Sequence, residues 1–383
     1  MTRAKQKLKL GQIPIQRHPD ASYQVLPYPD PPPHLPAGHG GLVVQNWYRR
    51  RLMDKGATLL PRDPMIGVDG KPALWGWGTA LVVLPAGQHL VQAQLGTAEA
   101  ERMVTIADGE VVTLEYAAPR NSFCRGVLGP PRQRQPGLSY GNTLFGILMV
   151  YLPLGTFVDA HDYPLYTVGY PTVASLPAAF VAAALIQRHI DRRGRIRAAG
   201  PPVPVRAVTA GGALQFLDGE PEPVDDPSGH PGKRPRATAE LPHFLGAAPP
   251  PEPVEGYGAV VLTSSFRTEV TTTMSCWSPH AVSTWTPLPT VRIDGRPVPA
   301  SWSTWWYPLP AGPHEIEVTE PASARLRVEV VAGRTHYVHC RAKIRIVRDR
   351  TDSHVVDQRA TVTLRPDSPR RGRAKAVRSR IVT

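Results

Sequence analysis

The sequence has few cysteines and lacks several motifs that mark common enzyme classes. Its three cysteines, Cys124, Cys276 and Cys340, lie far apart, and no CxxC pair occurs. A disulfide framework or a zinc finger is therefore not expected, and the thiols should be reduced. The chain has no HExxH, no GxxxxGK[ST] and no GxGxxG that opens a helix. We expect no catalytic residue, no metal site and no cofactor.

Acidic residues are also scarce relative to basic ones. The chain has 44 Lys and Arg against 31 Asp and Glu, with a formal net charge of +13. This excess suits a nucleic acid or an anionic membrane surface as a partner, and by itself it does not distinguish the two. No apolar stretch follows the charged N-terminus, so no cleavable signal peptide is expected.

Proline (44) and glycine (33) are frequent and concentrated in a few segments. Such clustering predicts ordered domains joined by segments that fold poorly. We expect an extended Pro-rich arm at 1–39, a disordered linker at 198–255 and a basic tail at 366–383.

Two uncharged runs predict a membrane hairpin within residues 138–187. The runs 135–158 and 163–187 are each about as long as a helix that crosses the roughly 30 Å of hydrocarbon. Each contains a proline, which neighbouring helices can accommodate in a bilayer. A buried helical hairpin in a larger soluble core is the alternative interpretation.

The charges beside these runs predict their orientation. The short connection at 159–162 has no Lys or Arg, whereas arginines flank both outer ends. Positive flanks remain cytoplasmic, so both termini should be cytoplasmic in a bacterial inner membrane. Anionic lipid is then an expected partner of the basic segment after the second run, which contains Arg192, Arg193, Arg195 and Arg197.

An internal repeat lies on either side of this segment. Residues 68–89 (VDGKPALWGWGTALVVLPAGQH) align without a gap with residues 293–314 (IDGRPVPASWSTWWYPLPAGPH), and ten of the 22 positions are identical. The Asp-Gly pairs indicate tight hairpin turns, and alternating stretches such as HEIEVT at 314–319 indicate strands with one buried face. The chain is thus expected to be all-β repeats plus a membrane α-hairpin, with antiparallel β-sandwich domains at 40–118 and 256–365.

The repeated pattern resembles PEGA-type domains, which are small β-sandwich modules of prokaryotic envelope and signalling proteins. The shared features are a hydrophobic residue before Asp-Gly, then Leu-Pro-Ala-Gly-x-His, then alternating apolar residues up to a Gly turn. The literal Pro-Glu-Gly-Ala string is absent, and Leu-Pro-Ala-Gly stands at the comparable turn. The resemblance implies a binding or spacer role and no catalytic residues.

Histidines and aspartates shared by both copies are interpreted as structural. His89 and His314 should pack under a turn and bond a backbone carbonyl, and Asp69 and Asp294 should bond nearby amides. The string from His336 to Cys340 contains three metal-ligand types. Strand positions three apart point to opposite faces, which argues against a metal site there.

The tryptophans of the repeat are the candidate contact residues. They exceed what a small core needs, and exposed aromatic side chains often anchor protein partners or enter the bilayer interface. Core packing is the competing interpretation. The candidates are Trp75, Trp77, Trp302, Trp305 and Trp306.

The function expected from these observations is a membrane-anchored, non-enzymatic binding or scaffold protein. Its two sandwich domains would face the cytoplasm and recruit a protein partner, and no nucleic-acid partner is expected. One alternative is an envelope protein whose outward-facing domains bind cell-wall glycan. Another is an accessory subunit of a membrane transport or secretion complex. The sequence indicates no oligomeric state.

Overall fold

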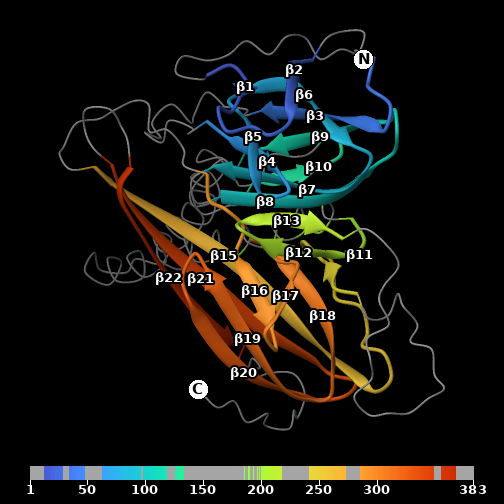
Figure 1. The fold of residues 1–383 in the computed structure, drawn as a ribbon, viewed down its shortest axis with the longest axis vertical. Coiled ribbons are helices and arrows are strands. Elements are labelled where there is room, and N and C mark those ends of the chain that lie inside the picture. Colours follow the sequence, from blue (N-terminus) through green and yellow to red (C-terminus); the bar gives the residue numbers. More distant parts are fainter. Residues whose placement is uncertain are drawn as a thin grey trace, which may run out of the picture.

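The computed structural model describes most of the two repeat regions and parts of the segments around them. The described residues are 13–28, 34–47, 63–95, 98–118, 126–132, 200–217, 241–272, 285–348 and 355–367, with the single positions Leu185, His189, Arg193, Ile196 and Ala198. This part of the chain is built from strands that form two domains (Figure 1).

The first domain packs two five-stranded sheets against each other around one core. One sheet has the order β1-β5-β4-β7-β8, and its strands are β1 (Gln16–Arg17), β4 (Met65–Val68), β5 (Lys71–Trp75), β7 (Gly87–Leu95) and β8 (Ala98–Ile106). The other has the order β10-β9-β3-β6-β2, and its strands are β2 (Gln24–Pro27), β3 (His39–Trp47), β6 (Gly78–Pro85), β9 (Val111–Ala117) and β10 (Val127–Gly129).

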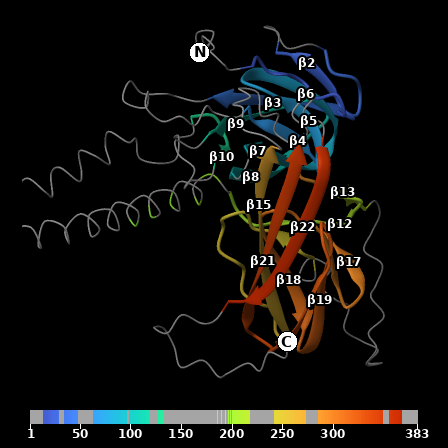
Figure 2. The ribbon, with the colours of Figure 1, turned by 90° about the vertical axis from the view of Figure 1, so that its left-hand side faces the viewer.

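The second domain is a sandwich of a six-stranded and a four-stranded sheet. The long sheet, β11-β14-β18-β15-β21-β22, contains β11 (Val203–Pro204), β14 (His243–Phe244), β15 (Tyr257–Thr272), β18 (Thr304–Pro310), β21 (Thr335–Arg348) and β22 (Val355–Pro366). The short sheet, β17-β16-β19-β20, contains β16 (Thr290–Ile293), β17 (Arg296–Val298), β19 (Gly312–Glu320) and β20 (Ala324–Val330). Figure 2 shows β15, β21 and β22 side by side as a long ribbon.

Both repeats have the same strand pairing. The order β5-β4-β7-β8 in the first copy recurs as β17-β16-β19-β20 in the second, and β9-β3-β6 recurs as β21-β15-β18. In each copy the central pair is parallel, β3 with β9 and β15 with β21. The repeated Asp-Gly turns have positive φ at Asp69 (52°) and Asp294 (51°) and at the glycine that follows. The hairpins predicted at these dipeptides are therefore confirmed.

The predicted membrane α-hairpin is wrong. Every regular element of the described residues is a strand, apart from five single helical positions between 185 and 198. Among the described residues, no helix is both long and apolar enough to cross a membrane. The two predicted spans lie outside the described residues, apart from Leu185. The prediction relied on uncharged length and on flanking arginines, but the apolar parts at 144–158 and 171–186 fall short of the roughly 20 apolar residues that a span requires.

Two of the predicted connecting segments contain strands. β1 and β2 belong to the predicted N-terminal arm, yet they pair with β5 and β6 of the first domain. β11, β14 and the hairpin of β12 (Ala207–Ala210) with β13 (Ala213–Phe216) belong to the predicted linker. Composition misled at β2 and β11, because short edge strands tolerate proline where a central strand does not. Residues 218–240 of that linker lie outside the described residues.

Trp285 joins the two domains. Its indole Nε1 donates to the carbonyl oxygen of Gly70 over 2.8 Å. Its ring covers Gly67, where an added Cβ would lie 2.2 Å from the ring. Beside it, the Gln94 amide donates to the carbonyl of Thr286 over 2.8 Å and accepts from the Thr286 N–H over 2.9 Å. The buried Gln94 side chain thus pairs with both the N–H and the carbonyl of Thr286, as the backbone of a neighbouring strand would.

The β12–β13 hairpin fills the seam between the domains. The Leu214 N–H donates to the Asp69 carbonyl over 2.9 Å. The Thr209 hydroxyl bonds both the N–H (2.7 Å) and the carbonyl (3.1 Å) of Ala300. Apolar side chains of both domains form one cluster, which includes Leu90, Met103, Leu214, Leu288 and Trp302. The domains therefore share a continuous core and form one unit.

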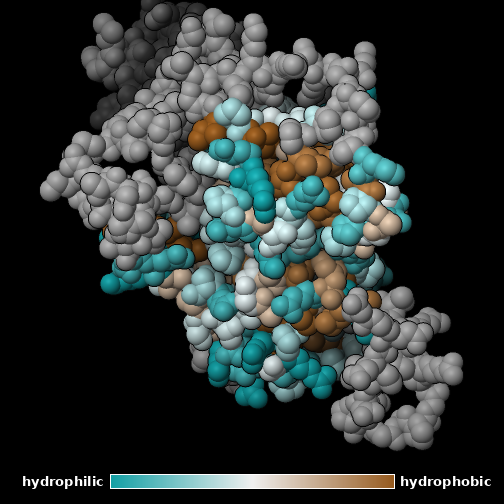
Figure 3. Space-filling view, turned by 45° about the horizontal axis from the view of Figure 1, so that its top comes forward, coloured by the Kyte–Doolittle hydropathy of each residue, from teal (hydrophilic) through white to brown (hydrophobic). Residues whose placement is uncertain are grey.

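The surface seen in Figure 3 is mixed in character. Hydrophobic residues reach it in the upper part and again about halfway down, and hydrophilic residues cover the lower end. This side of the molecule therefore has no single continuous apolar face.

Trp285→Ala should destabilise the whole unit. It removes one interdomain hydrogen bond and the packing on Gly67. Truncation of a fully buried Trp costs about 3–5 kcal/mol, and Trp285 is only partly buried, so we expect a loss of about 2–3 kcal/mol. Urea denaturation followed by circular dichroism measures it, and an unchanged midpoint would contradict the seam described above.

Candidate functional site

The repeated aspartate and histidine form the same clamp in both copies. His89 Nδ1 lies 2.8 Å from Asp69 Oδ2, its Nε2 lies 2.8 Å from the Pro85 carbonyl, and Asp69 Oδ1 accepts from the Leu90 N–H over 2.8 Å. In the second copy, His314 lies 2.6 Å from Asp294 and 2.9 Å from the Pro310 carbonyl. The structural interpretation of these residues is confirmed, because each ring bonds a backbone carbonyl below its turn.

Both ring nitrogens of His89 face acceptors, an arrangement that only the doubly protonated ring satisfies in full. Burial opposes the charged form, but the hydrogen bond and charge of Asp69 outweigh it and raise the pKa of His89 above its ordinary value. Neither nitrogen is free for a substrate or a metal. The clamp therefore holds a turn through both ring nitrogens.

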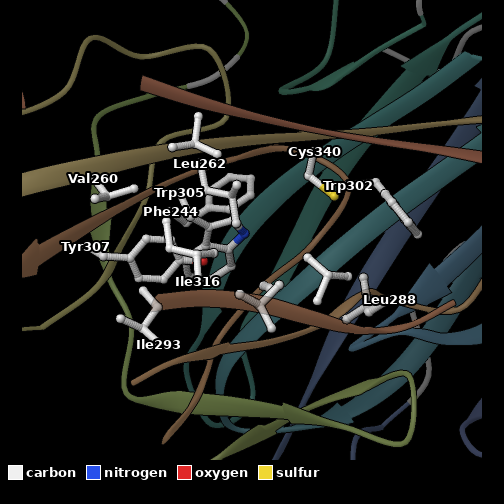
Figure 4. Close-up of a cluster of buried hydrophobic side chains, with 14 of the residues drawn as sticks. Phe244, Val260, Leu262, Leu288, Ile293, Trp302, Trp305, Tyr307, Ile316 and Cys340 are labelled. Atoms are coloured by element: carbon white, nitrogen blue, oxygen red, sulfur yellow. The ribbon is translucent and has the colours of Figure 1, made fainter. Parts of the chain in front are cut away.

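The predicted tryptophan contact surface is wrong for four of its five members. The exposed fractions are at most 2% for Trp77, Trp302, Trp305 and Trp306, and only Trp75 is half-buried. Figure 4 shows Trp305 in the core of the second domain near Phe244, Leu262 and Tyr307, and Trp302 farther along the same core on the side of Cys340.

Three of these tryptophans have specific positions in the fold. Trp305 Nε1 donates to Ser301 Oγ over 2.9 Å, and Trp302 Nε1 donates to the Pro287 carbonyl over 2.7 Å. Trp306 faces the other side of the sheet, where it clusters with Leu245. In the sequence, neighbouring tryptophans such as Trp305 and Trp306 look like a contact surface, because they must point to opposite faces of a strand. The structure shows that residues of the segment 241–250 pack against both of them, so both belong to the core.

The residues between His336 and Cys340 do not converge on a metal. His336 accepts from the Val331 N–H over 3.2 Å, while His339 faces outward, 3.5 Å from Asp367. Cys340 is fully buried, and burial raises the pKa of its thiol to about 11. Within the described ranges, no group of three potential metal ligands exists.

Of the predicted lipid-contacting arginines, only Arg193 lies among the described residues, and it is exposed. Arg192, Arg195 and Arg197 lie outside them. The expectation that the chain has no GxSxG string is wrong, because GLSYG occurs at 137–141, which also lies outside the described residues.

The outer side of the long sheet carries a concentration of cations that sequence reasoning missed. Inward residues of β21 alternate with outward ones, because Val338, Cys340, Ala342, Ile344 and Ile346 are buried. We define the basic face as the six exposed cations on this side of β15, β21 and β22: Arg267, Arg341, Lys343, Arg345, Arg359 and Arg365.

Three carboxylates on the same side balance half of this charge. Lys343 Nζ lies 3.0 Å from Glu269, and Arg359 Nε lies 2.9 Å from Asp357. The third carboxylate, Asp367, lies beside His339. The hydrogen bond from Lys343, together with the charges of Lys343, Arg267 and Arg345, lowers the pKa of Glu269.

Like charges stand directly opposite each other on the basic face. Arg345 is the cross-strand partner of Arg359, and Arg267 is that of Lys343. Such pairs destabilise a sheet. The outer side of the short sheet shows the opposite arrangement, since Glu315 faces Arg327 and Glu317 faces Arg325. The basic face therefore retains an unfavourable charge arrangement that the other sheet of the same domain avoids.

The alternation RAKIRI at 341–346 is the signal that could have indicated this face. A basic residue at every second position of a strand places all of them on one side. In the first copy, the pairing with β3 puts Thr113, Glu115 and Ala117 where the second copy has Tyr337, His339 and Arg341. The basic face is thus a feature of the second copy alone.

No protein-family model, no curated protein and no solved structure matches this chain.

Trp305→Ala should destabilise the second domain by about 3–5 kcal/mol, the usual cost of emptying a buried tryptophan site. Trp75→Ala is the matched control, because its half-buried ring should cost distinctly less. Urea denaturation of both variants measures the difference. A wild-type midpoint for Trp305→Ala would contradict the burial of this residue in the core.

His89→Gln should lower stability by about 2–3 kcal/mol near pH 6, because it breaks a buried charged hydrogen bond. The folded pKa is raised, so the charge-dependent part of this stabilisation is complete below the unfolded pKa of about 6.5. It is lost as the pH rises through the folded pKa.

His314→Gln is the control for this pair, because the Asp294 side chain is 46% exposed whereas that of Asp69 is 10% exposed. Its effect should be smaller. Thermal midpoints measured from pH 5 to 9 test both variants, and a His89→Gln effect that grows with pH has the wrong sign for this clamp.

Proposed function

We propose that this protein is a non-enzymatic binding or scaffold protein that recruits an anionic partner through the basic face of its second domain. The observation that carries this proposal is the pair of opposed like charges, Arg345 with Arg359 and Arg267 with Lys343. Carboxylates such as Glu269 and Asp357 compensate this repulsion only in part. Residues that violate a local folding preference in this way are typical of functional surfaces.

Protection of a sheet edge does not account for these cations. Edge strands often carry charges that prevent aggregation. That argument covers Arg359 and Arg365 on the edge strand β22. It does not cover Arg341, Lys343 and Arg345, because β21 is paired on both sides, with β15 and with β22.

The rest of the molecule supports a rigid presentation of this face. The first domain shares a core with the second, and its Gln94 and Gly70 bond the segment that leads into β16. Rigid elements position a binding surface more accurately than loops do. The PEGA-type resemblance, which implies a binding or spacer role, agrees with a scaffold of this kind.

Heparin-agarose chromatography of the full chain tests the proposal with a general polyanion. The double variant Arg341→Gln/Arg345→Gln should elute at a clearly lower salt concentration than the wild type. The matched control is Arg325→Gln/Arg327→Gln, which removes the same charge from the short sheet, where Arg325 is paired with Glu317 over 2.7 Å.

The control should elute close to the wild type. Equal shifts for the two double variants would mean that heparin senses only the net charge, and the basic face would then not be the contact surface. Circular dichroism should show that both variants retain the β fold.

A further inference from the structure

We infer that the basic face binds single-stranded nucleic acid, with the row of side chains along β21 contacting the backbone and the bases of one strand. This inference rests on the proposed function and assigns the class of its partner. This partner differs from the sequence-based prediction of no nucleic-acid partner. The structure adds the outward direction of Arg341, Lys343 and Arg345 on β21.

The cations on β21 lie in a straight row. A strand rises about 3.4 Å per residue, so the Cα atoms of Arg341, Lys343 and Arg345 follow one another at about 7 Å. Arg359 and Arg365 lie on the neighbouring strand, opposite Arg345 and His339. The result is a narrow strip rather than a broad patch, which suits a linear polyanion.

Aromatic side chains continue the same row. Tyr337 is 45% exposed, and His339 follows it on the outward side before Arg341. Proteins that hold single strands combine a positive surface that follows the backbone with aromatic rings on which bases stack. Tyr337 is the exposed aromatic ring that the described part of this face offers for stacking.

Hydroxyl groups lie beside the cations. Thr363 is the cross-strand partner of Arg341, and Thr361 is that of Lys343, and both threonines are exposed. Hydroxyl side chains commonly donate to phosphate and sugar oxygens, and they position a strand without reading its sequence. The face should therefore bind with little sequence preference.

An anionic bilayer would use the same cations, but it offers no base on which Tyr337 could stack. A duplex also keeps its bases stacked inside and unavailable to this ring. The contribution of Tyr337 therefore separates a single strand from both other polyanions.

Fluorescence anisotropy of the full chain with a labelled 20-nucleotide oligothymidylate tests the inference. The logarithm of the affinity should fall linearly with the logarithm of the salt concentration, with a slope of about −0.7 per neutralised phosphate. Arg341→Ala should make this slope shallower by about 0.7. Tyr337→Thr should weaken binding at least about fivefold and leave the slope unchanged.

Both substitutions introduce the residue that the first copy carries at the equivalent position, Ala117 or Thr113, so the fold should tolerate them. Arg327→Gln on the short sheet is the charge control and should change neither quantity. The comparison partners are a duplex of the same length and phosphatidylserine vesicles.

Weaker binding to the duplex and to vesicles, together with the Tyr337→Thr loss, supports the inference. Unchanged oligonucleotide affinity of Tyr337→Thr would overturn it, and so would vesicle or duplex binding as tight as single-strand binding. If heparin retention still depends on Arg341 and Arg345 in that case, the proposed anionic partner stands and only its assignment to nucleic acid fails.

Discussion

The burial of every second residue of β21 determines what this protein presents to its surroundings. Five side chains, from Val338 to Ile346, fill the core of the second domain, and the parallel pairing with β15 and the antiparallel pairing with β22 fix their register. A slip by one residue would bury Arg341, Lys343 and Arg345 and expose the apolar set. Packing of the core therefore holds the cations on the outward side. The same packing offsets the repulsion between the opposed cations of the sheet.

The two copies of the repeat have diverged around a common framework. Each retains the aspartate that adopts a positive φ and the histidine that it holds, because this clamp closes the turn between equivalent strands. The copies differ away from the clamp, on the outer sheet surface and at the seam between the domains. Glu115 of β9 is buried where β21 carries the outward-facing His339. The domain seam uses Gln94, Trp285 and the β12–β13 hairpin, which has no counterpart among the described strands of the repeat. The two copies thus have different roles in the molecule. The first domain packs against the second, and the second carries the basic face.

Local patterns in the sequence predicted the turns, the repeat and the structural role of His89 and His314, since these depend on neighbouring residues and on period-two alternation. Properties that depend on distant segments were not predictable in this way. Burial of Trp305 and Trp306 requires the segment at 241–250, which composition assigned to a disordered linker. The basic face requires the pairing of three strands separated by up to about a hundred residues, so the sequence relates only the three cations of the alternation at 341–346 to one another. The predicted membrane hairpin relied on uncharged length and on the arginines beside the two runs.

The central claim is that the partner lies along the outward side of β21. Ultraviolet crosslinking of the full chain to a single-stranded oligonucleotide containing 4-thiouridine, followed by mass spectrometry of the tryptic peptides, locates that contact directly. The account predicts crosslinks to peptides from 335–348 and 355–366, with Tyr337 among the modified residues. Crosslinks confined to the first domain or to the short sheet would contradict it.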